Sequence, residues 1–272
     1  MSPSGLEPSI QFTLPNKPVI ASTDITSLLQ KILGRFGYSI KRRRPGIRRG
    51  NSSSEIIVTV AGLMEAIHGD DIYKDFNYQA YAEDLAGWGG NSLAFAELIR
   101  EKKPGFIIEV GSWKGASAVT MADAMKAEGL DGQILCVDTW LGALEFWSDQ
   151  SDPERFRALE CKHGFPSVYY RFLANVCYRG HQKRIVPFPL PSSAAALWLM
   201  RTNLRADLIY LDGSHEEEDI YQDLLDYHTL LRPGGQVFGD DWGWSGVRAA
   251  VERFGAENHL PIRHLHDKWI LG

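Results

Sequence analysis

The feature that most constrains the fold is a regular alternation of short apolar runs and helical segments that starts near Gly105. Apolar runs typical of buried strands span residues 105–111, 133–138, 183–190, 208–212 and 236–241, and helical segments span 116–125, 216–231 and 245–254. This alternation predicts an α/β fold with a parallel sheet covered by helices on both faces. Two further runs within residues 262–272 leave no room for a helix between them, so they are expected to pair as an antiparallel hairpin.

The region before this alternation divides into two parts by composition. Residues 1–50 are an N-terminal extension that ends in a basic linker, Lys41–Arg49. This linker is interpreted as a solvated arm, with contact to a phosphorylated or anionic-lipid acceptor as the alternative. Residues 51–91 are expected to form a helical and aromatic segment that either closes over a ligand as a lid or packs on the core. Residues 92–272 then form the main domain.

Charge and cysteine content exclude several classes of partner. The chain carries 29 Lys and Arg against 34 Asp and Glu, a formal net charge of −5, so its overall field disfavours nucleic acid and anionic membranes. We find no uncharged apolar run of about 18 residues and expect no membrane span. Three cysteines without CxxC spacing, Cys136, Cys161 and Cys177, predict reduced thiols and a cytoplasmic location. The expected partner is a small molecule, and the oligomeric state, a homo-oligomer included, stays open.

A glycine-containing turn at residues 109–117 follows the first strand and opens into a helix. Gly111 allows a tight turn, Gly115 lets a ligand approach the backbone, and free N–H groups at the helix start suit a carboxylate or phosphate. The dinucleotide spacing GxGxxG is absent, because Trp113 stands where its second glycine would be. With Glu109 just before it, the turn favours a smaller nucleoside ligand over NAD, and an ordinary strand-to-helix turn is the alternative.

Asp138 ends the second strand, where an acidic residue can accept hydrogen bonds from both hydroxyls of a ribose. Aspartates at strand ends also cap helices and form turns, which is the alternative role. Together with the glycine turn, Asp138 indicates a nucleoside site at the carboxyl edge of the sheet. The long segment 139–182, which separates the second and third strands, is expected to build substrate surface beside it.

Three more aspartates follow the fourth and fifth strands. Asp212 lies in LDGSH, Asp240 and Asp241 lie in GDDW, and both strand ends share the carboxyl edge of a parallel sheet. Carboxylates brought together repel unless a cation lies among them, and ligation by oxygen alone favours Mg²⁺ or Mn²⁺. Adjacent strand residues point to opposite faces, so Asp240 and Asp241 share an ion only if the chain turns there, as Gly243 allows. Cap and turn roles are the alternative.

These features together resemble class I S-adenosylmethionine-dependent methyltransferases. The resemblance rests on Glu109-x-Gly111, on Asp138, on LRPGG before the fifth strand and on the closing hairpin, and it covers about residues 92–272. It implies a Rossmann-like sheet of seven strands in the order 3-2-1-4-5-7-6, with residues 92–272 as the S-adenosylmethionine-binding catalytic domain. It further implies that the methionine end of the donor lies at the turn, its ribose on Asp138 and its adenine near the segments that follow. The implied donor-binding residues, besides Asp138, are Glu109, Gly111, Ser112, Gly115, Ser117, Thr139, Trp140 and Ser192.

The aspartate pattern narrows the resemblance to metal-dependent O-methyltransferases. Catechol-type members of that group have an Asp after strand four, a basic residue three positions later and an acidic pair, or an acid and an amide, after strand five. Asp212, His215 and the pair Asp240–Asp241 occupy these positions. A histidine in place of the catechol-type lysine is more similar to enzymes that methylate natural-product sugars. The resemblance makes His215 the general base, since an imidazole with a pKa of about 6.5 accepts a proton at neutral pH; a helix cap is the alternative.

These observations lead to one principal hypothesis. It is a divalent-metal-dependent O-methyltransferase that moves the methyl group of S-adenosylmethionine to a hydroxyl of a polyhydroxylated small molecule, a sugar unit above all. The alternatives are a methyltransferase-fold hydroxylase-associated protein of natural-product biosynthesis, a non-catalytic nucleoside-binding protein and an NAD-dependent oxidoreductase. Trp242 and Trp244 flank the expected site and either stack on the acceptor ring or pack in the interior.

Overall fold

A computed structural model describes residues 59–148 and 152–272 of the chain. The predictions for residues 1–58, which include the extension and the basic linker, lie outside the described residues. The two 3-10 helices are η1 (Val60–Gly62) and η2 (Tyr78–Ala80). The α-helices are α2 (Leu63–His68), α3 (Leu93–Lys102), α4 (Ala116–Ala127), α5 (Leu144–Ser148), α6 (Pro153–Ala158), α7 (Val168–Tyr178), α8 (Ser192–Thr202), α9 (Glu217–His228) and α10 (Ser245–Asn258). The strands are β1 (Phe106–Val110), β2 (Gln133–Val137), β3 (Ile185–Phe188), β4 (Ala206–Leu211), β5 (Leu231–Gly239), β6 (Ile262–Leu265) and β7 (Lys268–Leu271).

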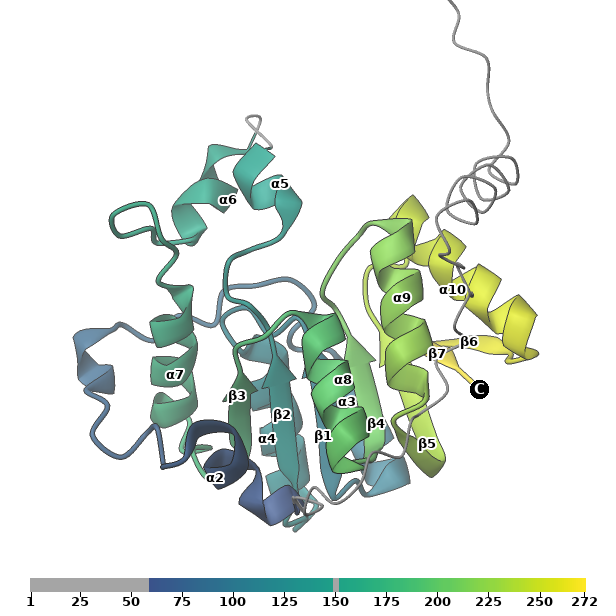
Figure 1. Cartoon of the computed structure of the whole chain (residues 1–272), viewed down its shortest axis with the longest axis horizontal. Coiled ribbons are helices and arrows are strands. Elements are labelled where there is room, and N and C mark those ends of the chain that lie inside the picture. The colour runs from purple at the N-terminus through teal and green to yellow at the C-terminus, as the bar shows by residue number, and fades with distance from the viewer. Residues whose placement is uncertain (1–58, 149–151) are drawn as a thin grey trace, which may run out of the picture. The chain divides into compact units, whose positions relative to one another are not determined.

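The strands form one seven-stranded sheet in the order β3-β2-β1-β4-β5-β7-β6 (Figure 1). Strands β1 to β5 run parallel, whereas β7 pairs antiparallel with both β5 and β6. The predicted strand order, the closing hairpin and the Rossmann-like α/β fold are therefore confirmed. The carboxyl ends of β1, β2, β4 and β5 consequently meet at one edge, where the predicted site residues lie.

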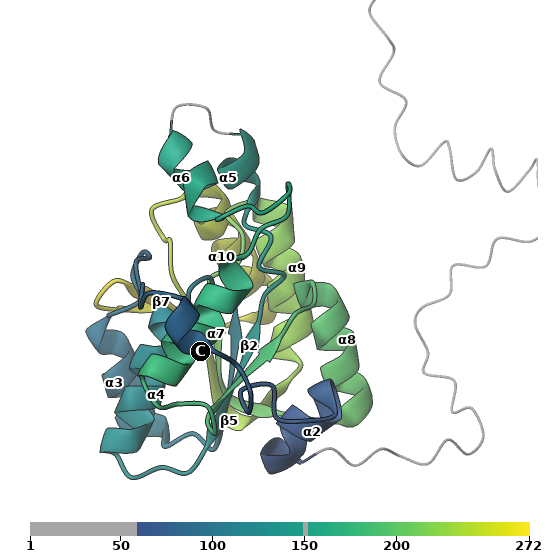
Figure 2. The same cartoon turned by 90° about the vertical axis from the view of Figure 1, so that its left-hand side faces the viewer.

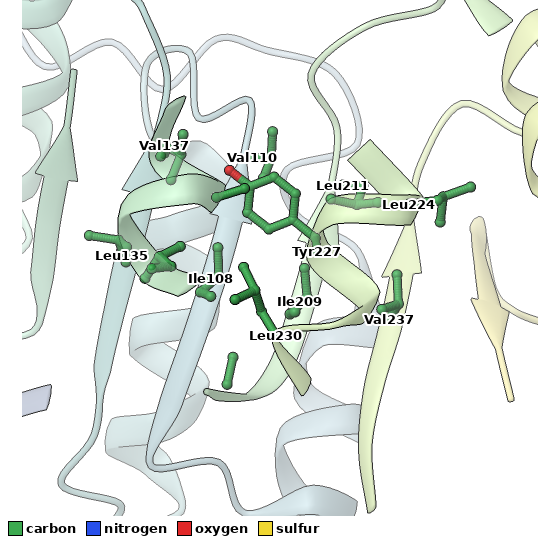
Figure 3. Close-up of a cluster of buried hydrophobic side chains, with 14 of the residues drawn as sticks. Ile108, Val110, Leu135, Val137, Ile209, Leu211, Leu224, Tyr227, Leu230 and Val237 are labelled. Carbon is green, nitrogen blue, oxygen red and sulfur yellow. The ribbon is translucent and has the colours of Figure 1, made fainter. Parts of the chain in front are cut away.

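Helices cover both faces of the sheet, because each central strand is apolar on both sides. Every residue of β1 is buried, and alternate side chains point to opposite faces. Ile108 and Val110 belong to the apolar cluster under α8, α9 and α10, where Tyr227 of α9 is fully buried (Figure 3). Ile107 belongs to the opposite cluster, which α3, α4 and α7 cover. Among the described residues, no helix has both the length and the apolar character that a membrane crossing requires.

The sequence motif Arg-Pro-Gly-Gly lies inside β5 and not before it. The sequence predicts a strand from residue 236 and a helix extending to 231, but β5 begins at Leu231 and α9 ends at His228. Leu231 pairs with Ala206, and the register shifts before Leu208 pairs with Gln236. Proline lacks an N–H donor, and Gly234 has a positive φ of 80°, so the motif forms an irregular start of the strand.

The described part of segment 51–91 packs on the domain. Leu63 of α2 is fully buried in the cluster under α8 and α9, the Tyr73 hydroxyl donates to the carbonyl of Ile185 at 3.1 Å, and a ring nitrogen of His68 lies 2.8 Å from the carbonyl oxygen of Pro187. These contacts tie the segment to β3. Helices α5 and α6 belong to the long segment after β2 and stand beyond the carboxyl ends of the parallel strands (Figures 1 and 2).

Candidate active site

The turn after β1 is shaped by residues with positive φ. Gly111 has φ 87°, and a Cβ there would lie 2.1 Å from the carbonyl oxygen of Asp212. Trp113 has φ 47°, and Gly115 has φ 86° where it precedes α4. Only glycine fits at position 111 without moving the backbone of the neighbouring strand end. The turn therefore brings the backbone of β1 directly against the residues that follow β4.

Asp138 holds this turn in place from the end of β2. One carboxylate oxygen accepts hydrogen bonds from the backbone N–H groups of Ser112 at 2.9 Å and Trp113 at 2.8 Å, and the other accepts from Trp140 N–H at 2.7 Å. The Trp140 indole, 2% exposed, donates to the carbonyl of Trp113 at 2.8 Å. The first oxygen uses both of its lone pairs on these two bonds, whereas the oxygen that faces Trp140 keeps one lone pair that can accept a bond from a ligand. Asp138 thus both fixes the turn and faces the adjoining cavity.

Glu109 stabilises the turn through hydrogen bonds on the side away from the cavity. It is fully buried, and its oxygens accept hydrogen bonds from the hydroxyls of Ser112, at 2.6 Å, and of Ser117. Burial raises the pKa of the Glu109 carboxyl above its ordinary value. The side chain does not line the cavity, and its hydrogen bonds to Ser112 and Ser117 lie within the turn and the start of α4.

A cavity of about 550 Å³ lies at the carboxyl edge of the sheet. This volume is in the range of small-molecule and cofactor pockets. Of the predicted site residues, nine line it: Gly111, Ser112, Ser117, Asp138, Thr139, Ser192, Asp212, His215 and Asp241. Glu109, Gly115, Trp140 and Asp240 are not among its lining residues. The structure thus gathers most predicted donor residues and two of the three predicted metal ligands around one space.

Asp240 and Asp241 follow β5 but point to different partners. Asp241 has φ 61°, so the chain has left the extended conformation at this point. The Asp241 carboxylate lies 2.9 Å from Nε2 of His215, inside the cavity. The Asp240 carboxylate instead accepts a hydrogen bond from Nζ of the fully buried Lys268. The turn anticipated after β5 is present, and the two carboxylates have different partners on it.

His215 is held between two acidic side chains and an aromatic ring. Its Nε2 faces Asp241, and its Nδ1 lies 2.9 Å from Oε1 of Glu145 in α5, without a well-aligned hydrogen bond to any described residue. The imidazole stacks on Trp244 with ring centroids 4.2 Å apart. Burial lowers the pKa of His215, but the Asp241 and Glu145 carboxylates outweigh it, and the pKa is raised above 6.5. Trp242, by contrast, packs on His264 away from the cavity.

Fewer candidate metal ligands face the cavity than the sequence predicts. The Tyr210 hydroxyl donates to Asp212 at 3.0 Å, and burial, followed by the charges of Asp240 and Asp241, raises the pKa of Asp212 well above its ordinary value. In residues 59–148 and 152–272, no three acidic, histidine or cysteine side chains are grouped so that they could hold a metal ion. Asp212 and Asp241 remain as cavity-facing carboxylates, and Mg²⁺ is commonly bound through one or two carboxylates with waters completing its shell.

Residues 108–242 match a family model described as a methyltransferase domain. The chain therefore carries a methyltransferase domain. The predicted resemblance to class I methyltransferases is confirmed at the level of family and fold, and the domain spans the turn, Asp138 and all three aspartates after β4 and β5. A comparison with curated proteins found no match.

The chain is similar to solved structures of O-methyltransferases, three of which share 17% to 21% of its sequence. The O-methyltransferase from Bacillus cereus, in complex with SAH, is 17% identical over 70% of this chain and 82% of its own, with a TM-score of 0.46. The calicheamicin methyltransferase CalS11 is 21% identical over 66% of this chain and 77% of its own, with a TM-score of 0.49. TomG from Streptomyces achromogenes, involved in tomaymycin synthesis, is 19% identical over 69% and 81%, with a TM-score of 0.44.

Several cavity residues of the methyltransferase are not predicted from its sequence. Glu145 and Phe146 of α5 and Arg155 of α6 line the cavity. Trp88 also lines it and belongs to segment 51–91, for which closure over a ligand is one of the two expectations. Trp88 contacts Phe146 edge-to-face at 6.0 Å, and the Arg155 guanidinium lies 5.8 Å from the Trp88 ring centroid. The available signal is general: the length of segment 139–182 predicts substrate surface, but no motif singles out an individual residue in it.

Proposed function

We propose that the chain is an O-methyltransferase that moves the methyl group of S-adenosylmethionine to a hydroxyl of a polyhydroxylated small molecule, with a sugar unit as the preferred acceptor. One observation carries this proposal: the cavity that contains the Asp138-anchored turn also contains His215, Asp212 and Asp241. A donor site and a proton-accepting site within one cavity of about 550 Å³ suit direct transfer between two bound molecules.

The donor is proposed to lie along the turn and the end of β2. The start of α4 offers backbone N–H groups to the methionine carboxylate. The hydroxyls of Ser112 and Ser117 donate to Glu109 and hold the turn beside it. Asp138 accepts a bond from a ribose hydroxyl through the one lone pair that its backbone bonds leave on Oδ1, and Thr139 and Ser192 border the adenine. Three of the predicted donor residues are proposed to act indirectly, by holding the turn in its conformation: Glu109, Gly115 and Trp140. Their observed contacts are with the turn and with the elements packed against it.

His215 is proposed to accept the proton of the acceptor hydroxyl. The His215 side chain lines the cavity, and its two ring nitrogens lie 2.9 Å from the carboxylates of Asp241 and Glu145. The acceptor oxygen forms a bond to the donor methyl carbon as the sulfur–carbon bond breaks, which releases S-adenosylhomocysteine. Asp241 and Glu145 then stabilise the imidazolium through their negative charges.

A divalent ion is proposed to bind at Asp212 and Asp241. When bound, Mg²⁺ or Mn²⁺ would lower the pKa of an acceptor hydroxyl and stabilise the alkoxide. Asp240 is left out of this donor set because its carboxylate is paired with Lys268. Tyr210, which donates to Asp212, orients that carboxylate at the cavity.

The polyol preference is supported by the character of the cavity near His215. Glu145, Asp212 and Asp241 provide hydrogen-bond acceptors for hydroxyl groups. Trp244 is 43% exposed and lines the cavity, so its ring offers a surface on which the apolar face of a sugar can stack.

The test has two stages. Calorimetric titration of S-adenosylmethionine and S-adenosylhomocysteine into the protein, in EDTA, measures donor binding. Release of S-adenosylhomocysteine is then followed with a panel of vicinal-diol and sugar acceptors, with Mg²⁺ and with EDTA. Donor binding and turnover that depends on Mg²⁺ are expected. Absence of donor binding under both conditions would contradict the proposal, and turnover that is equal in EDTA would remove the metal from it.

A further inference from the structure

One wall of the cavity is formed by residues 84–90, here called the wall segment. Gly87, Trp88 and Gly90 line the cavity. Two buried lysines hold this segment near its ends. Lys114, 7% exposed, donates to the Asp84 carboxylate at 2.5 Å, and Lys268, fully buried, donates to the carbonyl of Gly89 at 3.1 Å. The wall segment is therefore attached through charged side chains and not through apolar packing alone.

Lys268 joins three parts of the chain at one ammonium group. Its Nζ donates to Gly89 in the wall segment, to Asp240 after β5, and to Oδ2 of Asp267 beside β7 at 2.8 Å. An ammonium has three donors, so each is used. Burial lowers the pKa of Lys268, but Asp240 and Asp267 outweigh it and raise the pKa, so the side chain stays charged. Ser92 donates to the other oxygen of Asp267 and extends the network to the start of α3.

The contact between this network and the wall segment is close. Gly89 has φ 61°, and a Cβ there would lie 2.0 Å from Oδ2 of Asp240 and 2.7 Å from Nζ of Lys268. The next residue, Gly90, packs against the start of α4, where a Cβ would lie 2.5 Å from Cβ of Ala116. Thr120 of α4 donates to the Gly90 carbonyl at 2.7 Å. A displacement at Lys268 would therefore be transmitted to the side of the cavity assigned to the donor.

We propose that Lys268 is a positioning residue of the methyl-transfer site, which holds the wall segment against the donor through Gly89 and Asp240. The same contact keeps the Asp240 carboxylate out of the cavity, so that Asp212 and Asp241 face it. This inference rests on the proposed function, because it takes the ligand beside the wall segment to be S-adenosylmethionine. It assigns a role to the β7 hairpin that no sequence motif indicates.

The test compares S-adenosylhomocysteine binding by the intact chain and by Lys268→Met. Methionine keeps the length of the stem and removes the ammonium. The dissociation constant is expected to rise about tenfold or more, which corresponds to the loss of about 1.4 kcal/mol of binding free energy. Hydrogen exchange at the amides of residues 87–90 is expected to become faster, while that of central β1 is unchanged.

Lys268→Met leaves Asp240 buried without its partner and lowers stability for that reason alone. The double variant Lys268→Met/Asp240→Asn removes both charges, and its donor affinity is expected to fall as in the single variant. His181→Gln is the matched control. His181 is 3% exposed and is paired with Asp123 at 2.8 Å outside the cavity, so its loss should lower the melting temperature without changing donor affinity.

The outcomes separate the two proposals. If the intact chain does not bind S-adenosylhomocysteine, the proposed function itself is wrong. If the intact chain binds and a folded Lys268 variant binds within twofold, with unchanged exchange at residues 87–90, Lys268 has only a structural role and the inference is overturned. Weaker binding together with faster exchange in this segment, absent from the His181 control, supports it.

Discussion

Among single side chains, His215 is distinguished by the charges on both sides of its ring. Replacement by glutamine keeps a polar side chain but removes the proton acceptor, and general-base catalysis contributes about 10²–10⁴-fold to rate. We expect His215→Gln to lower kcat by a factor in this range and to leave S-adenosylhomocysteine affinity within about twofold. Steady-state kinetics and calorimetry measure the two quantities. His228→Gln, on α9 and outside the cavity, is the control; an equal loss there would argue against a role specific to His215.

Asp138 has a structural role as well as a proposed binding role, because its two carboxylate oxygens accept hydrogen bonds from three backbone N–H groups. An asparagine would present an NH₂ group to at least one of these donors and leave it unsatisfied. We expect Asp138→Asn to lower the free energy of unfolding by about 1–3 kcal/mol and to weaken donor binding at least about tenfold. Urea unfolding and calorimetry test this. Unaltered donor affinity in a destabilised variant would reduce Asp138 to a turn-forming residue.

The positions of Asp138 and Asp212 could be predicted because each directly follows a strand whose direction the apolar pattern reveals. The divergence of Asp240 and Asp241 could not, since it depends on the positive φ of Asp241 and on a lysine 28 residues away from Asp240. Glu145 was also missed. Glu145 lies on a helix 70 positions before His215 in the chain, and the spacing of residues along the sequence does not predict a contact over that separation.

Between β1 and α4, the turn depends on one backbone conformation. At Gly111 a Cβ would lie 2.1 Å from the Asp212 carbonyl oxygen, in addition to the cost of φ 87°. We expect Gly111→Ala to lower the free energy of unfolding by more than about 3 kcal/mol and to abolish donor binding. Gly129→Ala is a matched control, because Gly129 has φ 67° and a Cβ added there would meet nothing within 4 Å. It should cost only about 1–2 kcal/mol. Similar losses in both variants, measured by urea unfolding, would contradict the steric argument.

Strands and helices with strong periodicity were predictable, whereas irregular ones were not. The apolar runs located β1, β2 and β4, and the absence of room for a helix located the hairpin of β6 and β7. The early start of β5 was missed because Pro233 and two glycines ordinarily end regular structure, yet here they lie within a strand that pairs with β4 across a register shift. Helices α5 and α6 are five and six residues long, too short for their periodicity to stand out.

For the molecule as a whole, the pH dependence of stability contains an identifiable contribution from Asp223 of α9. Burial, with a smaller effect of the nearby Asp226 and Asp219 and an offsetting hydrogen bond from Ser192, raises the pKa of Asp223 to about 6. The folded state therefore binds this proton more tightly than the unfolded state does. The contribution is fully present below about pH 4 and is lost as the pH rises through about 6, a change of about 3 kcal/mol at 1.36 kcal/mol per unit.

Asp223→Asn should lack this dependence. Above pH 7 it is expected to be more stable than the unaltered chain by up to about 3 kcal/mol, and below pH 4 the two should converge. Asp226→Asn is the control, since the same helix carries it in a less buried position. Urea unfolding between pH 4 and 8 provides the comparison. A constant difference between Asp223→Asn and the unaltered chain across this range would show that Asp223 has an ordinary pKa.

The bond from Lys268 to Gly89 spans 179 residues of sequence, which has a consequence for biosynthesis. A chain emerging from a ribosome at about 5–20 residues per second must wait on the order of ten seconds or more between synthesis of these two residues. During that interval β1, β2 and β4 can already pair and Lys114 can already bond to Asp84, but the Lys268 ammonium that holds Gly89 is missing. Nascent chains, and fragments that end before the hairpin of β6 and β7, would therefore contain most of the sheet but lack a complete donor pocket. Donor affinity would then distinguish the full-length chain from these shorter chains.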